Sequence, residues 1–340
     1  MPAVGAARTI RSPAAQNRER EFEMMKRLLA TVAAAAVLAA AAAGPAAAQT
    51  APKVVLAISG WTGFAPLTLA EKAGLFKKNG VDVEIKFIAQ TDRLAALASG
   101  DVQGVATTVD TQLLWATTLP VTQVLVLDNS NGGDGLAARA PIADVKSLKA
   151  KTIAVDGAGT TPYFVLAYVL KKSGMSIKDV HTVTLAPQPA AQAFVAGQYD
   201  GASTYEPYLS QIRDMKDAKI VATTVDYPCV IDTLSFQPDF IQKNRKAVEG
   251  IVAGWFDALD MIRTDQAKSY EIMGAAVKQT GPQFGDSAKY IKWIDKPTNE
   301  RQMTGMIPEF QKAAAEIQLE AGVMKKTPDL DKMLDPSFVK

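Results

Sequence analysis

The chain has 340 residues, of which 48% are hydrophobic and 21% charged, a composition typical of one or two globular domains and not of a disordered or fibrous protein. Its 37 basic and 35 acidic residues nearly balance, so no strong net field favours nucleic acid or an anionic membrane as a partner. The single cysteine, Cys229, and the single histidine, His181, exclude an internal disulfide framework, thiolate zinc sites, iron–sulfur clusters and multi-histidine metal sites. We therefore expect no metal and no cofactor.

The N-terminal region has the layout of a secretory signal peptide. The basic pair Lys26 and Arg27 precedes a mostly alanine run at 28–43, and three alanines end at Ala48. This pattern predicts that residues 1–48 form the signal peptide region, with cleavage after Ala48. A retained anchor is the alternative, but the run is shorter and less apolar than the roughly 20 residues of a spanning helix. No cysteine lies at the cleavage site for lipid attachment, so we expect a periplasmic protein without a lipid anchor.

Beyond Lys53, short apolar runs alternate with helical segments, which is typical of an α/β fold with a largely parallel sheet. Strands are expected at 54–59, 81–88, 104–107, 121–127, 152–155, 182–185, 201–204 and 219–222. Helices are expected at 66–78, 91–99, 108–118, 161–173, 189–196 and 207–214. A helix, a glycine and a short strand recur at 95–105 and at 193–202, which indicates the same unit in two halves.

The part of the chain beyond Gln237 reads as helical, and the β pattern stops there. An amphipathic stripe runs through Val248, Ile251, Val252, Trp255, Leu259 and Ile262. Such a stripe needs a surface to pack on, so we expect this tail to cover one of the two halves. Because the sequence contains no low-complexity linker after the signal peptide region, direct strand crossovers between the halves are expected.

Two loops at predicted strand ends favour contact with a small ligand. In the segment 60–66, glycines permit a tight turn while Trp61 and Phe64 offer flat walls; burial in the core is the alternative for both aromatics. The segment 156–162 opens a helix, so the free amides there and the hydroxyls of Thr160 and Thr161 suit an anionic or carbonyl group. It lacks the Gly-Lys-Ser/Thr of a P-loop, and simple helix capping is the alternative.

Two further polar segments follow predicted strands. The turn at 128–135 contains Asp134; a structural turn and ligand contact are both compatible with it, and a calcium loop lacks its terminal glutamate. Glu206 lies between a strand end and a proline-started helix, where it serves either a ligand or the helix N-terminus. His181 leads a short predicted strand without a recognisable nucleophile or carboxylate partner and is expected to be structural. Cys229 reads as a small buried hydrophobic residue.

Four segments together carry a family resemblance over residues 53–214. They are GWTGFAPLTLAEKAGLFKKNGVDVEI, AALASGDVQGVATT, SLKAKTIAVDGAGTTPYFVLAYVLKKSGM and AQAFVAGQYDGASTYEPYLS. In order and spacing the chain resembles the periplasmic solute-binding proteins of ABC importers for nitrate, sulfonates, taurine and thiamine-precursor pyrimidines. The resemblance implies a type II periplasmic binding fold, with two α/β lobes, a two-strand hinge and a ligand cleft.

When the family's lobes are placed on this sequence, the resemblance implies a first lobe at 53–136 and 238–340, with the C-terminal helices packed on it. It implies a second lobe at 137–237. The family's ligand contacts fall on Trp61, Thr108, Thr160, Thr161 and Glu206. Our own additions are Phe64, Asp134, Tyr163 and Asp232. Because these candidates include acids and no assured arginine, they favour a ligand with a cationic or donor-rich part, such as an amino-sulfonate, an aminopyrimidine, or a urea- or guanidine-like molecule.

The implied function is that of a monomeric, non-enzymatic subunit. It captures a small molecule and delivers it to a permease in the inner membrane that works with a cytoplasmic ATPase. Two alternatives share the fold. One is an enzyme similar to some thiamine-pyrimidine synthases. The resemblance implies that those enzymes need a clustered-cysteine iron site and a reactive histidine, and this reading is disfavoured because the chain has one cysteine and one histidine, far apart in sequence. The other is a periplasmic receptor that feeds a sensor kinase.

Overall fold

The computed structural model describes residues 18, 20, 22–26 and 52–340. The predicted apolar run and the cleavage site after Ala48 lie outside these residues. No helix in the described part of the chain has the length and apolar character needed to cross a membrane. The chain divides into two units, Met1–Thr50 and Ala51–Lys340, and both sheets belong to the second unit.

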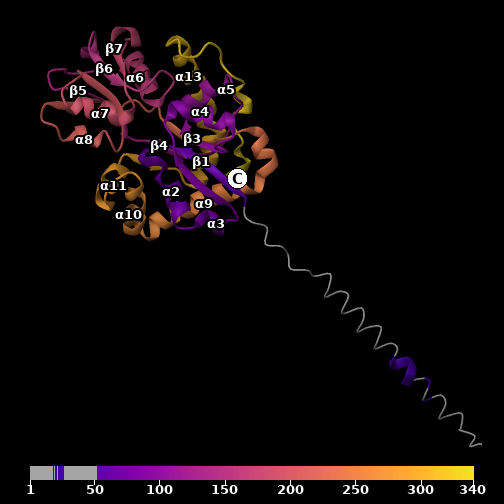
Figure 1. Cartoon of the computed structure of the whole chain (residues 1–340). Coiled ribbons are helices and arrows are strands. Elements are labelled where there is room, and N and C mark those ends of the chain that lie inside the picture. The colour runs from indigo at the N-terminus through magenta and orange to yellow at the C-terminus, as the bar shows by residue number, and fades with distance from the viewer. Residues whose placement is uncertain (1–17, 19, 21, 27–51) are drawn as a thin grey trace, which may run out of the picture. The chain divides into compact units, whose positions relative to one another are not determined.

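Six strands form a first sheet in the spatial order β11-β4-β10-β3-β1-β2. Figure 1 labels β1, β3 and β4 of this sheet. Their bounds are β1 Lys53–Ile58, β2 Asp82–Phe87, β3 Gly104–Thr108, β4 Thr122–Ser130, β10 Ile231–Phe236 and β11 Ile291–Trp293. Strand β1 runs parallel to β2 and β3, because helical crossovers connect these strands. Strand β10 runs antiparallel to both β3 and β4, and β11 runs antiparallel to β4.

Five strands form a second sheet in the order β7-β6-β8-β5-β9. Their bounds are β5 Asp134–Arg139, β6 Thr152–Val155, β7 His181–Thr184, β8 Gly201–Tyr205 and β9 Ala218–Thr223. Strand β6 is parallel to β7 and β8, whereas β5 is antiparallel to β8 and β9. The same combination of a parallel core and an inserted antiparallel strand thus occurs in both sheets.

The strands missing from the sequence-based set are β10 and β11, and of β5 only a β-like run at 136–139 is recognisable in the sequence. The expectation that β structure ends before the helical tail is wrong, because β11 adds an edge strand at Ile291–Trp293. Strand β10, IDTLSF, escaped the strand pattern because it alternates apolar with acidic and hydroxyl residues, yet all six are buried. The antiparallel strands also make both sheets mixed rather than largely parallel.

Helices cover both sheets. Those associated with the first sheet are α2 Ala65–Lys72, α3 Leu75–Lys78, α4 Gln90–Ser99, α5 Val109–Ala116, α9 Pro238–Thr264, α10 Gln266–Ala276, α11 Gly281–Ala288, α12 Lys296–Arg301 and α13 Ile307–Glu320. Those of the second are α6 Thr161–Lys172, α7 Pro187–Val195 and α8 Ser210–Arg213. The single helix expected at 66–78 is two helices, because Gly74 takes a left-handed conformation between them, with φ of 72°.

The C-terminal helices pack mainly on the first sheet, as expected. The amphipathic stripe lies in α9, which packs against α2 and α3. Gly254 permits this approach, since a Cβ atom there would lie 2.5 Å from the ring of Phe76. Helix α13 contacts α5 and also α6, so the tail touches helices of both sheets.

The chain crosses between the sheets twice, at 131–133 and at 224–230. The two crossovers are hydrogen-bonded to each other: Thr224 Oγ1 lies 2.7 Å from Ser130 Oγ and accepts from the Gly132 amide at 2.8 Å. Paired short connections of this kind let two lobes rotate about one line. We keep the two-lobe division as a proposal, with its boundaries moved to these crossovers, because β10 joins the first sheet and β5 begins at Asp134.

Candidate functional site

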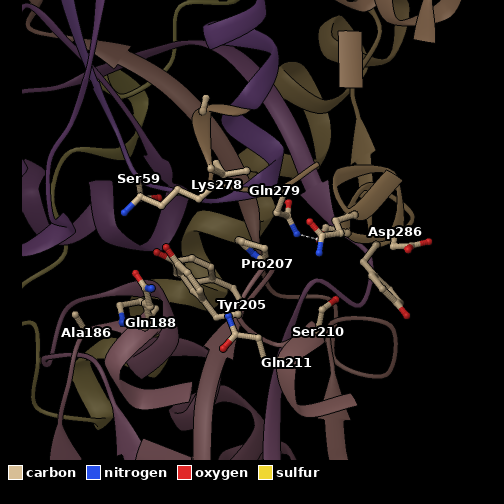
Figure 2. A pocket seen from close by; sticks show the side chains of 18 of the residues that line it. Ser59, Ala186, Gln188, Tyr205, Pro207, Ser210, Gln211, Lys278, Gln279 and Asp286 are labelled. Carbon is tan, nitrogen blue, oxygen red and sulfur yellow. Dashed lines mark hydrogen bonds between the residues drawn. The ribbon is translucent and has the colours of Figure 1, made fainter. Parts of the chain in front are cut away.

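Two cavities lie where the sheets face each other. The outer cleft has a volume of about 1080 Å³. Figure 2 shows Ser59 and Lys278 on one side of it and Ala186, Gln188 and Gln211 on the other, with Tyr205 near the centre. Ser59 and Tyr205 also line a second, inner pocket, so these two side chains stand between the two spaces.

The inner pocket has a volume of about 20 Å³, close to the space of one water molecule. Its lining comes from both sheets and from the crossovers: Ser59, Trp61, Phe64, Gln90, Arg93, Thr107, Thr108, Asp134, Thr161, Tyr205, Val230 and Asp232. Most of these residues lie at or just beyond strand ends, the edge of an open α/β sheet at which ligands bind. The pocket is therefore the candidate binding site.

An aromatic wall forms one side of the inner pocket. The Trp61 ring meets the Tyr205 ring edge to face, with centroids 5.7 Å apart, and Trp61 Nε1 donates to Asp128 Oδ1 at 3.2 Å. A Cβ atom at Gly133 would lie 2.5 Å from the Trp61 ring, so glycine at this crossover makes room for the indole. Burial raises the pKa of the Tyr205 hydroxyl, which keeps it protonated.

Hydroxyl groups from the two sheets meet at the inner pocket. Thr108, just before the first residue of α5, and Thr161, at the start of α6, have their Oγ1 atoms 2.9 Å apart. Gln90 Nε2 lies 3.0, 2.9 and 2.7 Å from the Oγ1 atoms of Thr161, Thr107 and Thr111, and its two N–H groups donate to this set of hydroxyl oxygens. These bonds join the two halves of the site directly, so the lobes are in contact across it.

Carboxyl groups collect on and behind the remaining wall. Asp134 and Asp232 line the inner pocket, Asp128 is the cross-strand neighbour of Asp232, and Asp110 lies in the first turn of α5. Burial raises the pKa of both Asp110 and Asp134 to about 7. Burial raises the pKa of Asp128 and of Asp232 well above the usual range. The charge of Asp128 raises the pKa of Asp232 further, whereas a hydrogen bond between the two side chains lowers the pKa of Asp128 in part.

Arg93 is the cation that lines the inner pocket. It is 1% exposed, and it donates from Nε to the Ile88 carbonyl at 2.9 Å and from Nη1 to the Ala106 carbonyl at 2.5 Å. Burial lowers the pKa of its guanidinium to about 10, so it remains charged at neutral pH. The expectation that the site has no assured arginine is therefore corrected, although two of its donor groups already serve the backbone.

The structure brings six of the nine predicted contact residues together in the inner pocket: Trp61, Phe64, Thr108, Asp134, Thr161 and Asp232. Two others, Thr160 and Tyr163, line a separate small cavity of about 10 Å³ between α6 and the end of α13. There Thr160 donates its hydroxyl to the Gly157 carbonyl at 2.8 Å, which is a local loop contact.

Glu206 lies apart from both cavities. Its Oε1 accepts from Arg213 Nε at 2.9 Å, and its Oε2 accepts from the Ser210 amide at 3.1 Å. The side chain is fully buried, and Arg213 also donates to the Gly132 carbonyl at 2.6 Å. Because both oxygens already have partners, we treat Glu206 as a brace between β8, α8 and the crossover instead of a ligand contact.

Sequence reasoning missed Ser59, Gln90, Arg93, Thr107, Tyr205 and Val230 as lining residues. One signal for Arg93 was available: it lies four positions before Leu97 on α4, and both are buried. An arginine on the apolar face of a helix needs a polar counterpart inside the protein. Gln90 gave no such signal, because only the tertiary structure brings the start of α4 to Thr161.

Comparison with known proteins decides the family. A family model described as the NMT1-like family matches residues 47–276. The chain belongs to the NMT1-like family. The taurine-binding periplasmic protein of Escherichia coli (strain K12) is 27% identical over 204 residues, which cover 58% of this NMT1-like chain and 63% of the relative.

Solved structures confirm the fold of this NMT1-like protein. The alkanesulfonate-binding protein SsuA from Xanthomonas axonopodis pv. citri bound to MOPS is similar with a TM-score of 0.72 and 17% identity, over 85% of this chain and all 100% of that one. The periplasmic nitrate-binding protein NrtA from Synechocystis PCC 6803 is similar with a TM-score of 0.69 and 17% identity, over 84% of this chain and 86% of that one. The predicted periplasmic binding fold and the family resemblance are thus confirmed.

Proposed function

We propose that this NMT1-like protein is the extracytoplasmic solute-binding subunit of an ABC importer. It captures one small polar molecule between its lobes and delivers it to a permease in the inner membrane, which works with a cytoplasmic ATPase. The observation that carries this proposal is the inner pocket, which both sheets line and which the Thr108–Thr161 contact spans. The similar proteins are named as binding taurine, alkanesulfonate and nitrate, and these names support a small polar cargo.

The geometry supports capture by closure of the two lobes. A ligand enters through the outer cleft, passes Ser59 and Tyr205, and reaches the polar groups of the inner pocket. The hydrogen-bonded crossovers at Ser130 and Thr224 serve as the hinge. Closure then brings Thr161 of the second lobe onto Thr108 of the first, and the closed surface is what the permease recognises. We propose that the protein acts as a periplasmic monomer, because one chain supplies both sides of the pocket.

We propose no catalytic role for the residues that usually carry one. Burial raises the pKa of the Cys229 thiol well above its ordinary value, which disfavours the nucleophilic thiolate. His181 begins β7 and is exposed. In the described part of the chain, no group of three or more His, Cys, Asp or Glu side chains is arranged to hold a metal ion. Binding, not turnover, is therefore the proposed activity.

The test is a thermal-shift screen of the exported protein after unfolding and refolding to remove bound ligand. The panel contains taurine, alkanesulfonates, nitrate, aminopyrimidines, urea and guanidine. A ligand that binds only the folded state stabilises it by RT ln(1 + [L]/Kd), about 2.7 kcal/mol at a hundredfold excess over Kd. We expect at least one clear rise in Tm, with a smaller radius of gyration in solution scattering. No rise for any compound would overturn the proposal.

Genome context separates import from signalling. A neighbouring permease and ATPase would support delivery to an importer. A neighbouring sensor kinase without them would overturn the importer role and leave a periplasmic receptor with the same pocket.

A further inference from the structure

Two carboxyl oxygens at the inner pocket are buried without a hydrogen-bond partner among the described residues. They are Oδ2 of Asp134 and Oδ2 of Asp232, and each of these side chains is 2% exposed. An unpaired buried carboxyl oxygen costs free energy. Both side chains line the pocket, from β5 beside one crossover and from β10 beside the other.

The groups around these oxygens strengthen the local negative charge. Asp128 Oδ2 behind Asp232 and Asp110 Oδ1 on α5 also lack partners within the described structure. On the other side stands Arg93, whose Nε and Nη1 serve backbone carbonyls. Among the residues that line the pocket, two carboxyl groups meet one guanidinium, so the site carries an excess of negative charge when both acids are ionised.

The remaining walls suit a nitrogen cation. The rings of Trp61 and Phe64 line the pocket beside Asp134 and Asp232, and aromatic faces attract ammonium and guanidinium groups. The pocket volume of about 20 Å³ is close to the space of one water molecule, so it fits a single ammonium nitrogen, and a larger amidinium group requires the pocket walls to move apart. The rest of a ligand extends toward Ser59 and Tyr205, where the outer cleft begins.

We propose that the inner pocket is a subsite for an organic cation, whose ammonium or amidinium group donates N–H bonds to Asp134 and Asp232 and packs against Trp61 and Phe64. This assignment rests on the proposed solute-binding function and names the chemical class of its cargo. A bare metal ion is a poorer occupant, because the described carboxyl groups form no metal-holding cluster and two walls are aromatic.

The test uses pairs of probes that differ mainly in the cationic or donor group. The pairs are taurine and isethionate, ethanolamine and ethylene glycol, guanidinium and urea, and an aminopyrimidine and its hydroxypyrimidine analogue. Each is added at matched millimolar concentration to the refolded protein, and Tm is measured. We expect the nitrogen-donor member of at least one pair to raise Tm and its partner to have no effect.

The other outcomes overturn the proposal in distinguishable ways. Equal rises within every responding pair, or rises with isethionate, nitrate or alkanesulfonates alone, would overturn the cation subsite and leave the solute-binding function standing. A rise with a divalent metal ion alone would replace the organic cation by a metal. No rise with any compound would overturn both the subsite and the proposed function.

Substitutions of the two pocket aspartates test whether the responding probe binds at these side chains. We expect Asp134→Asn and Asp232→Asn each to weaken binding of the responding probe at least about tenfold, since each removes a charge-assisted hydrogen bond. The matched control is Asp239→Asn, an exposed aspartate in the first turn of α9, which is expected to bind as the unmodified protein does. Circular dichroism and chemical unfolding check that each variant folds. Binding by Asp134→Asn and Asp232→Asn at the control's level would contradict the assignment.

Proton release gives a readout that needs no variant. Groups near Asp134 and Asp232 are Asp110, Asp128, Asp156, Glu206, Cys229, Tyr205 and Arg93. Because burial keeps the pKa of Asp134 at about 7, much of this carboxyl group is protonated at pH 6. A cation displaces that proton, so affinity should rise between pH 6 and pH 8. Calorimetry in two buffers with different ionisation enthalpies measures the release; pH-independent binding without release would overturn the proposal.

Discussion

The Glu206 corner and the Asp134–Asp232 pair are both buried acidic regions beside strand ends, but they differ in their partners. Both Glu206 oxygens accept hydrogen bonds, and Arg213 supplies the opposite charge. Asp134 and Asp232 each keep one oxygen without a partner among the described residues. The difference teaches that burial of an acid alone does not mark a binding site: a satisfied carboxylate holds structure together, whereas an unsatisfied one beside a cavity is available to a ligand.

The largest effect on stability is expected from breaking the ion pair between Glu206 and Arg213. Arg213→Met leaves the carboxylate of Glu206 buried without its counter-charge, and we expect the free energy of unfolding to fall by about 3–5 kcal/mol. Urea unfolding at pH 7 measures the loss. The control is Arg263→Met, because Arg263 pairs with Asp260 on the surface and should contribute less than about 1 kcal/mol. Equal losses in both variants would mean that the Glu206 corner is not a brace.

The carboxyl groups of Asp134 and Asp232, each with one oxygen unpaired among the described residues, should make the stability of the ligand-free protein depend on pH. The pKa of Asp134 rises from 3.8 to about 7 on folding, so the folded state holds more protons than the unfolded state between these values. Stability is therefore highest at low pH within this window and falls as pH rises toward 7, by up to roughly 4 kcal/mol for one such group. Asp110, with the same direction and value, adds to the slope.

Asp134→Asn tests which carboxyl group causes that slope. The amide cannot ionise, so at pH 8 the variant should be more stable than the unmodified protein by roughly 2–4 kcal/mol, while at pH 4 the two should nearly coincide. Thermal unfolding at both pH values measures the difference. A variant that is less stable at pH 8 would show that Asp134, like Glu206, is structurally satisfied.

A smaller loss is expected from Glu206→Gln. Glutamine keeps the shape and a carbonyl acceptor for Ser210 or Arg213 but removes the charge, and Arg213, whose side chain is 19% exposed, can recover some hydration. We expect a loss of about 1–3 kcal/mol, less than for Arg213→Met. The ratio of the two losses, from urea unfolding of both variants, is the informative quantity; a larger loss for Glu206→Gln would contradict the assigned roles.

The smallest effect concerns the contact between the lobes. Thr108→Val removes the hydroxyl that meets Thr161 with little change in volume, and we expect a loss of about 1 kcal/mol. A double-mutant cycle with Thr161→Val isolates the coupling between the two side chains. Additive losses would show that this contact does not help to hold the lobes together.

Much of the fold was predictable because it depends on local periodicity. Alternating strands and helices predict the α/β class, and the amphipathic stripe around Trp255 predicts the long helix α9. Strands β10 and β11 were not predicted, because β10 carries acidic and hydroxyl residues and β11 has only three residues. The break at Gly74 was missed because the helical periodicity continues across it.

The sequence by itself identified the family and the loops that carry the site, since glycine turns, aromatic residues and strand ends are local signals. Only the tertiary structure decided which polar residues act together. It paired Glu206 with Arg213 seven residues further along the chain, placed Thr160 and Tyr163 at a different cavity, and brought Arg93 into the pocket beside Asp232. The physical reason is that hydrogen-bond satisfaction depends on how the folded chain orients and surrounds each side chain, which no local sequence pattern specifies.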